Sequence, residues 1–145
     1  MAWENLPSTN TPINATNLNK ITDSGSNTNG YYIKYQDGTL IQYGYISKDT
    51  LVPPTTNSTT VQGIIWYRTN NVSLSFPISF KDTNYSFEVT VHNGVSGTRI
   101  SIPRAGEKAA SNIGVQLITI EPVTSGETAA SNLYGVSWLA IGKWM

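Results

Sequence analysis

The chain has 145 residues, a net charge of zero and no cysteine, and only 12% of its residues are charged. The scattered cations exclude a clustered basic surface for nucleic-acid phosphates or anionic membranes. The absence of cysteine excludes disulfides, thiolate metal sites and cysteine nucleophiles. We therefore expect no nucleic-acid partner and a fold that is held by packing or by subunit association.

No apolar stretch is long enough for a transmembrane helix. The first residues, MAWENLPSTN, also lack the basic and apolar regions of a signal peptide. We expect neither membrane insertion nor a cleaved leader.

A short helix is predicted near the N-terminus. Asn14 has the N-cap preference before a helix over residues 15–21, and Ile13, Leu18 and Ile21 give this helix one apolar edge. So short a helix is unstable alone in water, so we expect it to pack on its own domain or on copies of itself.

The stretch TDSGSNTNG, which follows the helix, has the composition of a flexible linker. We therefore divide the chain into an attachment and oligomerisation segment with its linker, residues 1–29, and a β domain, residues 30–145.

Strand patterns fill the rest of the chain. The turn sequence Gln36-Asp37-Gly38 separates two aromatic and aliphatic runs, Tyr31–Tyr35 and Thr39–Ile46, which predicts a hairpin. A loop is expected over residues 47–60. Further strands are expected at 61–69, 72–76, 85–92, 99–102, 113–120 and 134–143.

About eight short antiparallel strands with Gly, Asn and Pro turns predict an all-β fold, and we favour an antiparallel β-sandwich over a barrel. The last strand is apolar on both faces, so we expect it at the centre of a sheet or beneath a partner chain. The echo between GEKAASN at 106–112 and GETAASN at 126–132 indicates either matching loops at one end of the sandwich or coincidence.

Catalytic groups are sparse. His92, the only histidine, falls on the solvent side of its strand with Glu88, and the acids form no compact motif. We predict no catalytic residue, no metal site and no cofactor. A glycan-cleaving enzyme stays open as an alternative, because a carboxylate pair can be assembled from distant positions.

Aromatic and planar polar side chains are better represented, and neutral sugars are bound by such groups without a nucleophile or a metal. In an all-β domain the same aromatics also fill cores and interfaces, which is the competing interpretation for Trp66 and Trp138. Our candidate ligand-binding residues are Trp66, Tyr67, Arg68, His92, Arg99 and Tyr134.

The start of the chain resembles the opening of many bacteriophage structural proteins, especially tail and baseplate proteins of phages of Gram-positive hosts. The shared features are a tryptophan, a Pro-Ser-Thr run that ends in Thr-Pro, and a helix start with Asn-Leu-Asn. They fall here at Trp3, at residues 7–12 and at residues 17–19.

From about Gly30 onward the chain is similar to the C-terminal domains of phage tail fibres. The first hairpin of those domains resembles NGYYIKYQDGTLIQYG, their Phe-Pro-x-x-Phe strand with the next strand resembles FPISFKDTNYSFEVT, and their closing motif resembles GVSWLAIGKW. Phe76-Pro77 and Val136-Ser137-Trp138 also resemble the H-type lectin fold, a trimeric β-sandwich that binds sugars such as N-acetylgalactosamine.

The resemblance implies a homotrimer on the virion surface that recognises a glycan of the bacterial surface. It implies synthesis in the host cytoplasm and attachment to other virion proteins through residues 1–29. The alternative is a head or tail decoration protein without a ligand. Our candidate interface residues are Ile13, Leu18, Ile21, Trp138 and Trp144.

Overall fold

A computed structural model describes residues 20–47, 50, 58–61, 64–68, 71–93, 101–119 and 133–145, and all regular elements in these ranges are β-strands. The first sheet has the strand order β1-β2-β3-β10-β7, and its neighbouring strands are antiparallel. Its strands are β1 (Ile21–Asn27), β2 (Gly30–Tyr35), β3 (Thr39–Ser47), β10 (Leu133–Lys143) and β7 (Ser86–Asn93).

The second sheet is built around β9. Strand β8 pairs with one edge of β9, whereas β6 and β5 pair with the other edge, near its first and last residues. Its strands are β4 (Ser58–Val61), β5 (Ile64–Arg68), β9 (Asn112–Thr119), β6 (Val72–Ser75) and β8 (Ser101–Lys108).

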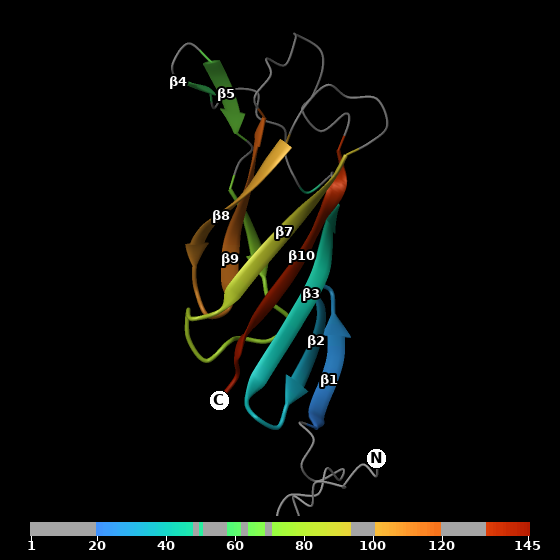
Figure 1. The fold of residues 1–145 in the computed structure, drawn as a ribbon. Helices are drawn as coiled ribbons and strands as arrows, with labels where there is room; N and C mark the ends of the chain where they lie inside the picture. Colours follow the sequence, from blue (N-terminus) through green and yellow to red (C-terminus); the bar gives the residue numbers. More distant parts are fainter. Residues whose placement is uncertain are drawn as a thin grey trace, which may run out of the picture.

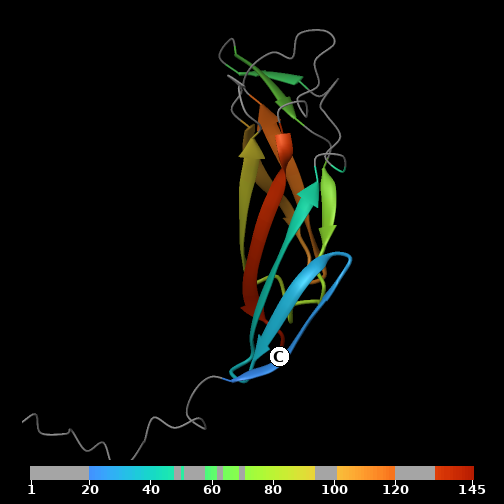
Figure 2. The same ribbon diagram turned by 90° about the vertical axis from the view of Figure 1, so that its right-hand side faces the viewer.

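The two sheets form an elongated sandwich (Figure 1). Strands β4 and β5 lie at the end opposite the C-terminus, and Figure 2 shows β1 and β2 toward the end that holds it. The all-β, antiparallel prediction is confirmed.

The core lies between the sheets and follows the strand alternation. On β10, Val136, Trp138 and Ala140 are buried, whereas Leu139 and Ile141 face outward. This strand lies between β3 and β7, which confirms its predicted central position. Residues of both sheets and the loop after β6 meet in one buried cluster: Leu40, Ile46, Leu74, Phe76, Phe80, Tyr85, Ile113, Val115, Leu117, Val136, Trp138 and Ala140.

The predicted hairpin is present as β2 and β3. Gly38 has a φ of 82°, a left-handed conformation that glycine adopts without a Cβ penalty. The Thr39 N–H donates to Asp37 Oδ1 over 2.8 Å. Two hydrogen bonds hold the C-terminus against this turn. The Trp144 N–H donates to the Gly38 carbonyl over 3.0 Å, and Trp144 Nε1 donates to the Tyr35 carbonyl over 3.2 Å.

The linker prediction for the stretch TDSGSNTNG, residues 22–30, is wrong, since Ile21–Asn27 form β1 and pair with β2. Small polar residues are compatible with an exposed edge strand as well as with a linker. Here the main-chain groups on the free edge of β2 form hydrogen bonds with this segment, and these bonds favour the strand. Ile21, the last residue of the predicted helix, therefore lies in a strand, while residues 13–19 lie outside the described ranges.

Two further differences concern loops. Residues 58–60, predicted to end a loop, form β4 together with Val61 and pair with β5 in a hairpin. Gly106, Glu107 and Lys108, the start of the first echoed segment, belong to β8, where the register with β9 shifts between Ala105 and Lys108. The second echoed segment, 126–132, lies outside the described residues.

Candidate functional site

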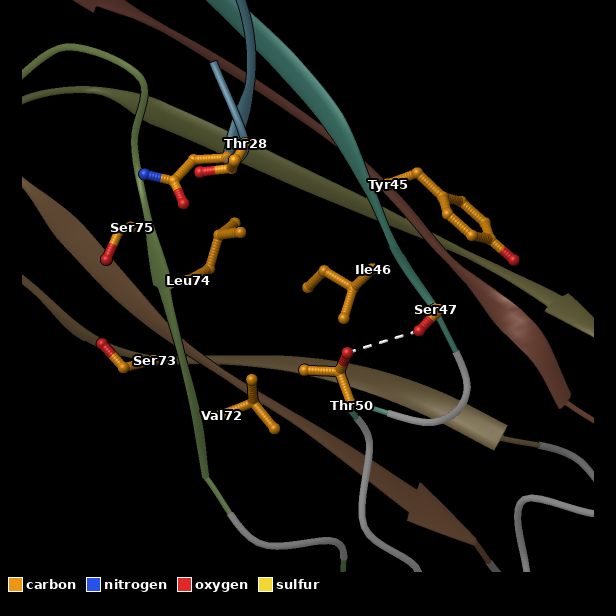
Figure 3. A pocket seen from close by; sticks show the side chains of 10 residues that line it. Thr28, Tyr45, Ile46, Ser47, Thr50, Val72, Ser73, Leu74 and Ser75 are labelled. Carbon is orange, nitrogen blue, oxygen red and sulfur yellow. Dashed lines mark hydrogen bonds between the residues drawn. The ribbon is translucent and has the colours of Figure 1, made fainter.

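A pocket of about 340 Å³ lies where β6, the end of β3 and the β1–β2 turn meet (Figure 3). The ten described residues that line it are Thr28, Asn29, Tyr45, Ile46, Ser47, Thr50, Val72, Ser73, Leu74 and Ser75. We call it the edge pocket, because β6 is an edge strand in the described part of its sheet. All four β6 residues line it in succession, as expected when a strand presents its main-chain edge rather than one face.

The edge pocket has an apolar base and a polar rim. Ile46 and Leu74 are 6% and 7% exposed and belong to the core, so the base is fixed by the packing of both sheets. The hydroxyls of Ser47 and Thr50 approach to 3.3 Å at the rim. The ring of Tyr45 is turned away from Ile46 and Leu74 (Figure 3).

Asn27 fixes the turn that borders the pocket. Its Nδ2 donates to the Pro77 carbonyl over 3.2 Å, which ties β1 to the segment after β6. Its Oδ1 accepts the Asn29 N–H over 2.8 Å. One side chain therefore sets the position of Thr28 and Asn29 relative to β6.

A second pocket, of about 470 Å³, lies over the register shift of β8 and is lined by Asn71, Arg104, Ala105, Gly106, Glu107 and Gln116. Its side chains are mostly planar polar groups, one cationic and one anionic. The Asn71 amide lies against Gly114, where an added Cβ would lie 2.5 Å from Asn71 Oδ1. We call it the bulge pocket.

The outward side of the first sheet carries large aromatic and aliphatic side chains, four of them exposed and Leu139 half-buried. We call this surface the outer face, and its residues are Tyr31, Tyr43, Tyr45, Leu139 and Ile141. Tyr31, Tyr43, Tyr45 and Ile141 are 53%, 42%, 56% and 41% exposed. The rings of Tyr31 and Tyr43 stack with centroids 5.2 Å apart. Tyr43 also lies opposite Leu139 in the β3–β10 register, so the apolar residues are continuous across three strands.

His92 is exposed, as predicted, at the end of β7. Its Nε2 lies 2.7 Å from Ser137 Oγ, and its ring lies 6.2 Å from that of Tyr45, so it borders the outer face. The side chains of the other candidate ligand residues, Trp66, Tyr67, Arg68 and Tyr134, lie outside the described part of the chain, as does Arg99 altogether. Of the six candidates, the structure therefore places the side chain of His92 alone.

The candidate interface residues have different surroundings. Trp138 is 3% exposed inside its own sandwich, which leaves little side-chain surface for a neighbouring subunit. Trp144 is half-buried against the same core, whereas Ile21 is 58% exposed on β1. Ile13 and Leu18 lie outside the described ranges.

Sequence reasoning missed the edge pocket, because it joins three segments whose residues are common surface types. For the outer face a signal was present: Tyr31, Tyr43 and Tyr45 fall on alternating positions of a predicted hairpin, which places them on one side of the sheet.

Neither a metal site nor a membrane-spanning helix is found in the part of the chain that the structure describes. No group of three or more potential metal-ligating side chains occurs there. No helix there is long and apolar enough to cross a bilayer.

The family described as "Putative tail fiber protein gp53-like, C-terminal" has a sequence model that matches residues 34–143, which is 110 of the 145 residues. The chain belongs to this family. The match runs from β2 to the end of β10 and confirms the resemblance to phage tail fibre C-terminal domains. The protein is thus a virion component of tail-fibre type. No curated protein and no solved structure matches the chain.

Proposed function

We propose that this protein attaches the phage to its host by binding a glycan on the bacterial surface. The observation that carries the proposal is the family match, because a tail-fibre domain is the part of a virion that meets the cell. The surface chemistry supports a glycan: the chain has few charges and is rich in Asn, Ser, Thr and Tyr, whose amides, hydroxyls and rings recognise sugars without a cofactor.

The protein acts as a homotrimer, held on the virion surface by residues 1–29. It needs no signal peptide, because phage particles leave the host by lysis. Three copies convert weak individual sites into useful avidity, because binding of the second and third sites becomes intramolecular. A non-enzymatic role fits the structural family.

The outer face is the surface on which a second copy docks. Interface cores are enriched in aromatic residues and depleted of charges, with a polar margin. The outer face has this composition, since tyrosines lie at its centre and Ser24, Ser26, Thr90 and the charged Glu88 lie at its margins. Zero net charge leaves little long-range repulsion between copies.

The size of this sheet face is also adequate. Five strands about 4.8 Å apart and about eight residues long cover roughly 600 Å², close to the roughly 800 Å² that each partner contributes to a standard interface.

Light scattering after size exclusion tests this assembly. We expect a mass of three times 15.8 kDa for the wild-type chain and a lower mass for the double variant Tyr43→Ser with Ile141→Ser. The control is Ile102→Ser, because Ile102 is 39% exposed on β8 of the other sheet. A monomeric wild type would refute the trimer, and an unchanged mass in the double variant would refute the outer face as its interface.

Labelled full-length protein, incubated with a panel of intact Gram-positive bacteria, tests receptor binding. We expect saturable binding to at least one strain, which is lost after periodate oxidation of the cell-surface sugars and retained after protease treatment of the cells. Binding that survives periodate and disappears with protease would point to a protein receptor and refute a glycan.

A ligand-free structural or decoration role is the second candidate, and the outer face favours it, since that surface suits assembly without any receptor. It predicts no binding to any strain. A glycan-cleaving enzyme would instead release reducing ends from host polysaccharide. If no reducing ends were released from any of several polysaccharides, that result would count against an enzyme.

A further inference from the structure

We infer that the edge pocket is the glycan site and that it takes an uncharged sugar unit, a neutral hexose or an N-acetylhexosamine. The inference rests on the proposed function and adds to it a location and a chemical class.

The absence of charge among the described lining residues sets the class of the ligand. None of the ten lining residues is Asp, Glu, Lys, Arg or His. An acidic sugar or a glycerol phosphate unit would lose hydration on entering such a pocket and would find no cation among the described lining residues to compensate, which is costly. A neutral sugar carries no such penalty.

The rim offers the hydrogen-bonding groups that sugar hydroxyls require. Ser47 and Thr50 share a single contact of 3.3 Å, and each hydroxyl can donate one hydrogen bond and accept two, so most of their capacity remains for a ligand. Asn29 adds an amide and Thr28 adds a third hydroxyl from the turn. Groups that both donate and accept match sugar hydroxyls, which do the same.

The base suits the apolar side of a pyranose ring. Ile46, Val72 and Leu74 are aliphatic and line the pocket together, and all three pack in or against the core. The C–H groups on one side of a neutral pyranose can lie on such a base while its hydroxyls reach the rim.

The size limits the ligand. A volume of about 340 Å³ lies at the lower end of the range of about 300–1,000 Å³ typical of small-molecule sites, which is room for one or two sugar units. The double hydrogen bond of Asn27 to Pro77 and Asn29 holds the turn in place before binding, so little ordering is needed when the sugar enters.

The bulge pocket is the less suitable site for a neutral sugar. Arg104 and Glu107 line it, and among its described lining residues Ala105 is the one aliphatic side chain. It provides no extended apolar base, and its two charged groups would have to be desolvated.

A glycan array carrying neutral oligosaccharides and sialic acid- or glucuronate-terminated ones tests the inference with the full chain. Thr28→Trp fills the pocket from an exposed turn position, and the double variant Ser47→Ala with Thr50→Ala removes two rim hydroxyls. Matched controls are Thr83→Trp and the double variant Ser79→Ala with Thr83→Ala, because both residues are exposed in the segment between β6 and β7 and belong neither to the pocket lining nor to the outer face.

We expect the wild type to bind neutral glycans, Thr28→Trp to lose binding more than ten-fold, and the hydroxyl double variant to weaken it about ten-fold. Both controls should bind as the wild type does. Preference for acidic glycans, or undiminished binding by both pocket variants, would overturn the inference while the proposed function stands. Loss of binding in Arg104→Ala alone would also overturn it and would place the site at the bulge pocket.

A wild-type chain that binds neither the array nor any bacterial strain would remove the proposed function, and the inference with it. Wild-type binding to periodate-sensitive cells with unaffected pocket variants would remove the inference only. Circular dichroism of each variant checks that it is folded.

Discussion

The side-chain amide of Gln42 occupies both main-chain hydrogen-bonding groups of Ile78. Gln42 Nε2 donates to the Ile78 carbonyl and Gln42 Oε1 accepts the Ile78 N–H, each over 2.9 Å. Gln42 is fully buried on β3, and Ile78 lies in the segment between β6 and β7, which forms no strand. The amide thus takes the place of a neighbouring strand for that segment.

Replacing Gln42 should destabilise the fold markedly. Gln42→Leu leaves the Ile78 N–H and C=O without their partners, and each unsatisfied group costs about 1–3 kcal/mol, so we expect a loss of about 2–4 kcal/mol in the free energy of unfolding. Urea unfolding measures it. Gln36→Leu is the control, since Gln36 is exposed in the β2–β3 turn and should change stability little. Equal midpoints for the two variants would contradict this role.

Gly44 makes room for the indole of Trp138. A Cβ at Gly44 would lie 2.7 Å from Trp138 Nε1 and 2.8 Å from Trp138 Cε2, closer than the packed core tolerates. We expect Gly44→Ala to cost about 1–3 kcal/mol and to shift the tryptophan fluorescence. Gly106→Ala is the matched control on β8, because its Cβ would meet its nearest atoms at 3.4 Å. Full stability of Gly44→Ala would refute the close fit.

Tyr85 makes stability sensitive to alkaline pH. Its ring packs against Phe76 and Phe80, its hydroxyl donates to the Ala109 carbonyl over 3.1 Å, and burial raises its pKa above the ordinary value of 10.0. Because the pKa is higher in the folded state than in the unfolded state, this contribution is complete below pH 10 and is lost as pH rises through the raised value.

Tyr85→Phe should therefore lower stability at neutral pH by about 1 kcal/mol, since the hydrogen bond is lost, and should flatten the decline above pH 10. Some alkaline decline remains, because burial and the adjacent Asp23 carboxylate also raise the pKa of Tyr32. Urea midpoints between pH 8 and 11 measure both effects, with the exposed Tyr43→Phe as control. Parallel curves for wild type and Tyr85→Phe would contradict the assignment.

Asn27 should act on ligand binding more than on stability. Asn27→Ala releases the turn of Thr28 and Asn29 from Pro77, so we expect several-fold weaker glycan binding with a change in unfolding free energy of about 1 kcal/mol or less. Thr22→Ala is the control, because Thr22 is also exposed on β1 and makes one hydrogen bond, to the Lys34 carbonyl. A pure stability defect with unchanged affinity would mean that the turn position does not matter for the ligand.

The strands of the domain were predictable because alternation and turn chemistry are local. Leu74 and Phe76 alternate with serines, which indicates a strand. The dipeptide Asp37-Gly38 favours a tight turn by its own conformational preferences, so the hairpin can be predicted without contacts from distant residues. Strand β1 was not predictable, because a stretch such as TDSGSN becomes a strand only when the edge of β2 is available to it.

The edge pocket was not predictable for a related reason. Its turn, its β3 residues and its edge strand are brought together only by the packing of the two sheets. The burial of Trp138 could have been predicted from strand alternation. Trp138 lies on the same side of β10 as Val136 and Ala140, and both are core residues. Sequence alone left core and interface open for this residue, because both bury aromatics equally well.

Isothermal titration of the full chain with purified neutral polysaccharide, from a strain whose cells retain the protein, tests receptor binding most directly. The account predicts saturable binding with one site per chain, and its loss in Thr28→Trp. Absence of binding heat for the wild type, together with no competition by the polysaccharide for cell attachment, would contradict glycan recognition and leave the protein a structural part of the virion.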